Sequence, residues 1–225
     1  MFTTSWIISI AILVVSFFGI IISALLFAKP VDEYKFSFLR IFPFEVMKNG
    51  ENNRKFYSFF TFLFSGMCFT PIIVIVEGSG KLVNLNPLSI LIACLLGLAA
   101  ICFVFLNIFD VTHTKPHLVL FAIFALLTLL SGVLVIVRGF TAYDLLKKHG
   151  TSEFFLILTV IACALGTLPV LCFIVNPKLK DWPRLDLIDG QYVRPKHFVL
   201  AYSEWGILLS LFLIEICYFA QLLVK

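Results

Sequence analysis

The sequence predicts an all-α polytopic membrane protein, a bundle of six transmembrane helices with its N- and C-termini on the extracytoplasmic side. Six apolar runs of 20 to 27 residues predict the spans, because roughly 20 helical residues cross a bilayer core. Hydrophobic residues make up 61% of the 225 residues and charged residues 13%, against about 45–50% and 25% in soluble domains. Unequal loop charge predicts the orientation. The runs are Trp6–Ala28, Phe56–Val76, Leu88–Phe109, Leu118–Val137, Phe154–Val175 and Phe198–Val224.

The first three runs each have a feature that bears on their role. The first run is longer than the apolar region of a signal peptide, and Met1–Ser5 before it carries no positive charge, so we expect a retained helix. The second run contains Gly66 and Pro71, and Pro71 is a candidate helix kink. At the cytoplasmic end of the third run lie Asn107 and Asp110, which share a helix face because they are three residues apart.

The last three runs differ in the same way. Pro116 precedes the fourth run, and proline is tolerated at a helix start. The fifth run contains Gly166 and Pro169, and Pro169 is the second candidate kink. Pro71 and Pro169 would occupy corresponding helices of two inverted three-helix halves, an arrangement found in many transporters. The sixth run is the only one that contains acidic residues within its predicted bounds.

The loops predict which side of the membrane each end occupies. Loops 29–55, 110–117 and 176–197 together hold 12 of the 17 lysines and arginines, and the other side holds five. Cytoplasmic loops carry an excess of Lys and Arg, so we expect these three loops in the cytoplasm and both termini outside, most simply at the plasma membrane. Because the loops are short, we expect a single domain over residues 1–225.

Two loop segments are candidates for contacts at the membrane surface. The stretch from Lys35 to Phe44 alternates basic and aromatic residues, which is typical of an interfacial segment; a partner-binding surface is the alternative. The stretch from Leu185 to Val193 reads as two short strands around an Asp-Gly turn, which would need to dock to be stable. The candidate contact residues are Phe38, Arg40, Phe42, Trp182 and Tyr192.

The candidate polar site lies on the last run. Glu204 and Glu215 are eleven residues apart, close to three helical turns, and therefore share a face. A charge near the bilayer centre costs roughly 2.5–3.5 kcal/mol, so Glu215 needs a partner, water or a proton. This stripe predicts either a proton- or cation-handling site or structural hydrogen bonds between helices. A second candidate cluster, at the cytoplasmic ends of the helices, comprises Asn107, Asp110, His117 and His197.

The sequence offers no motif for catalysis, a cofactor or a metal. All six cysteines fall inside apolar runs, where cysteine acts as a small hydrophobe. There is no phosphate-binding glycine loop, no Gly-x-Ser-x-Gly and no His-Glu-x-x-His. We therefore predict no catalytic residues, no metal, no cofactor and no nucleic-acid partner. The expected partners are the lipid bilayer and another membrane protein, with the oligomeric state open.

Three functions follow from these observations. The leading one is a non-enzymatic accessory, immunity-like or scaffold subunit that acts by association in the membrane. The alternative is a small transporter or permease component with a polar site around Glu215. The third is a membrane-embedded enzyme acting on a lipid-linked substrate, for which Asp110, His117, His197 and Glu204 would have to converge in one pocket.

Overall fold

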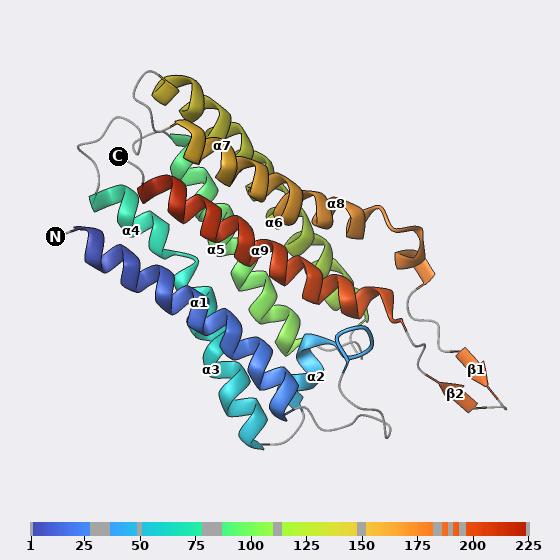
Figure 1. The fold of residues 1–225 in the computed structure, drawn as a ribbon. Coiled ribbons are helices and arrows are strands. Elements are labelled where there is room, and N and C mark those ends of the chain that lie inside the picture. Colours follow the sequence, from blue (N-terminus) through green and yellow to red (C-terminus); the bar gives the residue numbers. More distant parts are fainter. Residues whose placement is uncertain are drawn as a thin grey trace.

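The computed structural model describes residues 2–27, 37–48, 51–77, 87–109, 114–147, 152–181, 186–188, 191–193 and 197–223. Within these residues six helices are long and apolar enough to cross a membrane, which confirms the predicted number of spans. Both chain ends lie at one end of the bundle, here called the terminal end (Figure 1). The short helix α2 (Pro43–Lys48) lies at the opposite end, here called the α2 end.

The first half of the chain contributes three spans. Helix α1 (Phe2–Phe27) packs against α3 (Glu51–Met67), and α4 (Thr70–Glu77) continues the second span after a short break. Helix α5 (Pro87–Ile108) forms the third span. The break precedes Pro71, whose ring excludes the Met67 carbonyl from its usual helical partner. That carbonyl accepts the Thr70 hydroxyl instead, at 2.7 Å.

The second half contributes the other three spans. Helix α6 (Thr114–Leu146) is followed by α7 (Ser152–Ile161), the π-helical η3 (Ala162–Thr167) and α8 (Leu168–Ile174), which together form the fifth span. The π-helical turn ends two residues before Pro169, and the Thr167 hydroxyl donates to the Ala162 carbonyl at 2.9 Å. A π-helical turn is one of the ordinary ways in which a helix absorbs an irregularity.

The segment between the fifth and sixth spans is the 3₁₀ turn η4 (Pro177–Asp181) and a two-stranded hairpin. Strand β1 (Asp186–Ile188) pairs antiparallel with β2 (Gln191–Val193), and Leu187 lies opposite Tyr192. The hairpin extends away from the helices at the α2 end (Figure 1).

Helix α9 (Val199–Leu223) is the central helix of the bundle. Of its span, 72% is buried, against 28–44% for the other five. It contacts α1, α5, α6, α7, η3 and α8, and Phe212 stacks on Phe17 of α1 at 4.0 Å between ring centroids. It is also the least apolar of the six spans. This helix carries the buried Glu204, Glu215 and Gln221; because such side chains avoid lipid, its place in the interior follows.

Helix α6 differs most from its predicted bounds. Its apolar run was predicted to end at Val137, before Arg138, but the helix continues to Leu146. At 33 residues it is about 50 Å long, more than the ~30 Å core of a bilayer. The prediction that Arg138 lies in a loop is wrong, because this side chain is buried inside the bundle.

Candidate functional site

The polar side chains inside the bundle form three groups at different depths along α9. Glu204 lies at the α2 end, Glu215 lies beyond the middle of the helix, and Gln221 lies near the terminal end. All three are fully or almost fully buried. His117 and Arg138 of α6 contact the first and the last group. These two residues are 21 positions apart on one helix, which corresponds to about 30 Å.

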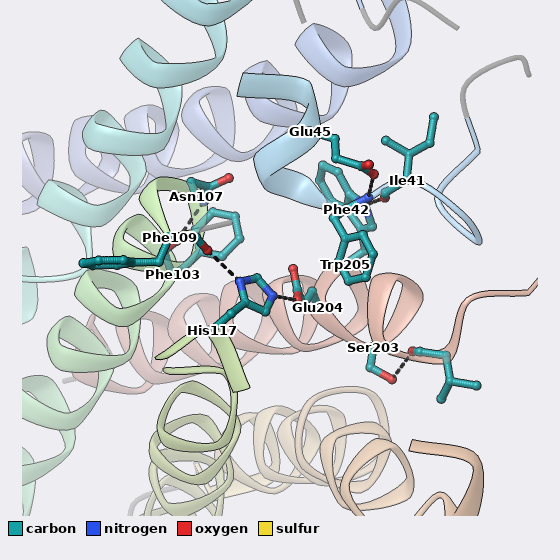
Figure 2. A network of polar contacts seen from close by, with 11 residues as sticks. Ile41, Phe42, Glu45, Phe103, Asn107, Phe109, His117, Ser203, Glu204 and Trp205 are labelled. Carbon is teal, nitrogen blue, oxygen red and sulfur yellow. Dashed lines mark hydrogen bonds and ion pairs between the residues drawn. The ribbon is translucent and has the colours of Figure 1, made fainter. Parts of the chain in front are cut away.

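The group at the α2 end is centred on an ion pair. His117 Nε2 lies 2.7 Å from Glu204 Oε1, with the two side chains 0% and 1% exposed. His117 Nδ1 lies 2.7 Å from the carbonyl oxygen of Phe109 (Figure 2). Because a carbonyl only accepts, Nδ1 carries a hydrogen. One further proton is then shared between Nε2 and the carboxyl group, so the buried pair has no net charge wherever that proton resides.

Two aromatic rings at the start of α2 pack against this pair, Phe42 just before the helix and Phe44 within it. Phe42 and Phe44 make edge contacts with the His117 ring, at 6.1 and 5.6 Å between centroids. The Phe42 amide donates to the Glu45 carboxylate at 2.8 Å, which fixes the start of α2 (Figure 2). Phe42 itself is buried, so it forms part of the core.

Asn107 contributes to the same end of the bundle. Its Nδ2 donates to the Phe103 carbonyl at 2.7 Å (Figure 2), and its Oδ1 accepts from the Tyr57 hydroxyl at 3.1 Å. Both side chains are buried. Asn107 therefore joins α5 to α3 through a satisfied polar contact.

Glu215 is different from every other buried acid in the described residues. Its side chain is 0% exposed, and neither carboxylate oxygen has a hydrogen-bond partner. Buried charges in proteins are normally paired or hydrogen-bonded. On the same helix, Glu204 follows that rule and Glu215 does not.

The group at the terminal end surrounds Arg138, and we name it the Arg138 cluster: Ser89, Arg138, Tyr218 and Gln221. Arg138 Nε donates to Ser89 Oγ at 3.2 Å, and Nη1 donates to Gln221 Oε1 at 3.0 Å. The guanidinium carbon lies 5.6 Å from the centre of the Tyr218 ring, and the Tyr218 hydroxyl donates to the Ser89 carbonyl at 2.6 Å. All of these partners are neutral.

The structure brings together some of the sequence-predicted residues and separates others. Glu204 meets His117, whereas His197 is exposed and makes no hydrogen bond or ion pair with either of them in the described part of the chain. Asp110 and Trp182 lie outside the described residues, and Tyr192 is described only as part of β2. Phe38 and Arg40 are partly buried. Pro71 and Pro169 both lie next to interruptions of their spans.

The site also contains residues that the sequence did not single out, chiefly the Arg138 cluster and Tyr57. The sequence does contain an indication that the helix continues past Arg138. The residues after it, Gly139 to Tyr143, are uncharged, so the helix could have been continued through the arginine.

Two apolar grooves open to the outer surface of the bundle and are lined by apolar side chains almost throughout. One, of about 410 Å³, lies between α1 and α9 and is lined by Phe18, Trp205 and Leu209 among others. The other, of about 420 Å³, lies between α1 and α3. Among the described residues, no three His, Cys, Asp or Glu side chains are grouped so that they could hold a metal ion.

Comparison of the chain with protein-family models, with curated proteins and with solved structures found no match.

Proposed function

We propose that the chain is a small proton-coupled membrane transport protein, in which Glu215 binds and releases the proton. The observation that carries this proposal is the fully buried Glu215 carboxyl group, which has no hydrogen-bond partner on either oxygen. Ionisable groups inside membrane spans characteristically belong to ion pathways and proton relays.

The contrast with Glu204 supports transport over a purely structural role. A glutamate that only joins helices is expected to bond to a neighbouring helix, as Glu204 does to His117 at 2.7 Å. Glu215 gains no such contact in this arrangement. A carboxyl group without donors is suited to exchange a proton when water or a ligand reaches it, because no internal bond has to be broken first.

The helix that packs against Ile214, the residue before Glu215 in the chain, supports the same proposal. The π-helical η3 contacts α9, and a Cβ on Gly166 would lie 2.7 Å from Ile214 Cγ1, next to Glu215. Irregular helical turns are frequent at functional sites and mark binding sites in transporters built from broken helices. Close packing at Gly166 would therefore couple movement of η3 to the Glu215 turn.

Replacing Glu215 with glutamine is expected to reduce proton uptake to the rate of protein-free liposomes. Glutamine has nearly the shape of a protonated glutamate but cannot release the proton. The measurement uses purified protein in liposomes that contain a trapped pH indicator, with chloride or formate gradients and a potassium-clamped voltage. Glu153→Gln, at an exposed position at the start of α7, is the matched control and should retain the wild-type rate.

Two results of this assay would contradict the proposal. One is a Glu215→Gln variant that takes up protons as fast as the wild type at equal protein content. The other is a wild-type rate equal to that of protein-free liposomes under every gradient. Equal melting temperatures of Glu215→Gln and wild type would show that a lost flux does not come from a lost fold.

A second candidate function is association with another membrane protein, in the accessory or scaffold role expected from the sequence. The groove between α1 and α9 favours it, because an apolar groove open to lipid offers a surface to a neighbouring helix. The same Glu215→Gln variant separates the two functions. A scaffold would keep its co-purifying partner in this variant, whereas a transporter would lose its flux.

We also propose that both termini lie outside the cell and that the chain resides in the plasma membrane. Since Arg138 is buried within α6, it no longer counts as a loop charge, and the Lys and Arg bias sharpens from 12 against five to 12 against four. In a cysteine-free background, a cysteine at Lys225 should react with an impermeant maleimide on intact cells. A cysteine at Lys178, exposed in η4 at the other end, should react only after lysis; the reverse pattern would invert the topology.

A further inference from the structure

Two hydrogen-bond donors of the Arg138 cluster have no acceptor. Arg138 Nη2 and Gln221 Nε2 are both buried and lack partners, and they belong to side chains that touch each other. Arginine has only donors, so the Gln221 oxygen must face it, as it does at 3.0 Å from Nη1. The Gln221 amide nitrogen is therefore left with both of its hydrogens unused.

Among the residues that the structure describes, no acidic side chain pairs with the Arg138 guanidinium. Arg138 is 4% exposed, and each contact that the structure gives it is neutral: the Ser89 hydroxyl, the Gln221 amide and the Tyr218 ring. A buried guanidinium is strongly destabilising without a counter-charge. The group that is missing is therefore an acceptor with a negative charge.

The packing around Gln221 limits the size of that group. A Cβ on Gly139 would lie 3.0 Å from Gln221 Nε2, so the backbone of α6 approaches the free donor closely. Thr159 of α7 also packs beside Gly139, and its hydroxyl already donates to the Phe155 carbonyl at 2.6 Å. Three helices, α6, α7 and α9, therefore meet beside Gln221 Nε2, and packing this close excludes a large ligand.

We propose that Arg138 and Gln221 bind a small monovalent anion, such as chloride or a short carboxylate, through Nη2 and Nε2. The binding of an anion here is independent of the proposed function. Only the further step, that this anion is transported together with the proton, rests on the proposed function. Glu215 lies six residues before Gln221 on α9, about 9 Å along the axis. An anion on Arg138 together with a protonated Glu215 leaves this part of the bundle electrically neutral, which is the condition for carrying an anion and a proton together.

The test measures the melting temperature of purified protein in detergent at equal ionic strength in sodium chloride, sodium formate or sodium gluconate. A ligand that binds only the folded state raises the melting temperature as its concentration rises. Wild-type protein is expected to respond to chloride or formate and not to gluconate, which is too large for a buried site. Arg138→Gln should bind at least about tenfold more weakly, as loss of a charge-assisted hydrogen bond implies.

A second variant keeps the inference testable if Arg138→Gln does not fold. Gln221→Glu places a carboxylate beside the guanidinium, so it should match or exceed the wild-type melting temperature in gluconate and show no response to chloride. Arg40→Gln, at a partly buried position in the segment before α2, is the control and should keep the full response. Equal wild-type melting temperatures in all three salts, or a full chloride response in Gln221→Glu, would overturn the anion site.

The outcomes also distinguish this inference from the proposed function. If Glu215→Gln loses proton uptake but still responds to chloride, both stand. If wild-type protein shows a Glu215-dependent flux without a chloride or formate response, only the anion site is wrong. If the response is present and the flux does not depend on Glu215, only the proton-coupled function is wrong.

Discussion

Glu204→Ala is expected to lower the free energy of unfolding by about 3–5 kcal/mol, which is the cost of removing one member of a buried ion pair. The alanine leaves the His117 Nε2 without its partner at 2.7 Å, in a site that is closed to water. The Phe109 carbonyl holds the other ring nitrogen, so the imidazole cannot turn away to find a new partner. Chemical unfolding of the purified protein in detergent, followed by circular dichroism, measures the loss.

A double variant provides the control for this prediction. His117→Phe with Glu204→Leu removes both polar groups and keeps the volume among the rings of Phe42 and Phe44. Replacing a buried pair by apolar side chains is often neutral, so the double variant should be more stable than Glu204→Ala alone. If the single variant unfolds like the wild type, or the double variant is the less stable of the two, the pair does not stabilise the bundle.

The size of this effect follows from the position of His117. The residue lies in the first turn of α6. Its side chain bonds to the carbonyl of Phe109, the residue that follows α5, and to Glu204 of α9. The rings of Phe42 and Phe44, at the start of α2, pack against its imidazole. One imidazole thus joins four elements at a point where the chain reverses direction, and its loss would loosen all of them together.

The six spans were predictable because membrane insertion depends on local sequence. A run of about 20 apolar residues cannot be placed elsewhere at reasonable cost, so the length of each run was enough. The shared face of Glu204 and Glu215 was predictable for the same reason, since it depends only on helical geometry. Their burial at the centre of the bundle follows from their polarity.

The partners were not predictable, because they depend on how distant helices pack. His117 and Glu204 are 87 residues apart in the chain; the sequence grouped them with Asp110 and His197 at one end of the helices, but it did not indicate which of the four would pair. The apolar run of α6 predicts a span that ends at Val137, just before Arg138; an arginine inside a span is costly, and the hydrogen bonds to Ser89 and Gln221 offset part of that cost. The sequence predicts the aromatic segment before α2 at the membrane surface. In the structure Ile41 and Phe42 of this segment are buried against the bundle, where α9 supplies a hydrogen-bond donor to the Ile41 carbonyl.

That donor is Trp205. Trp205→Ala is expected to lower the free energy of unfolding by about 3 kcal/mol or more, since Trp-to-Ala changes in protein cores cost about 3–5 kcal/mol. The indole Nε1 donates to the Ile41 carbonyl at 2.8 Å, and the ring makes an edge contact with Phe38 at 5.0 Å. Alanine would leave a cavity and an unpaired carbonyl at once. The segment before α2 would then detach more often from the bundle, because it would be held by fewer contacts, among them the backbone bond from Phe198 to Leu39 and the edge contact between Phe42 and Phe198.

Two measurements test this prediction, and a conservative variant separates their causes. Thermal unfolding reports the overall loss, and the rate of tryptic cleavage at Arg40 reports local opening of the segment. Trp205→Phe keeps an aromatic ring against Phe38 but leaves the buried Ile41 carbonyl without its donor, so it should cost about 1–3 kcal/mol, less than Trp205→Ala, while still speeding cleavage. Trp205→Ala that melts like the wild type and is cut no faster would show that the segment is held by other contacts. Faster cleavage at an unchanged melting temperature would instead separate the two roles of the indole, since the hydrogen bond would then order the segment while the bundle stands without the ring.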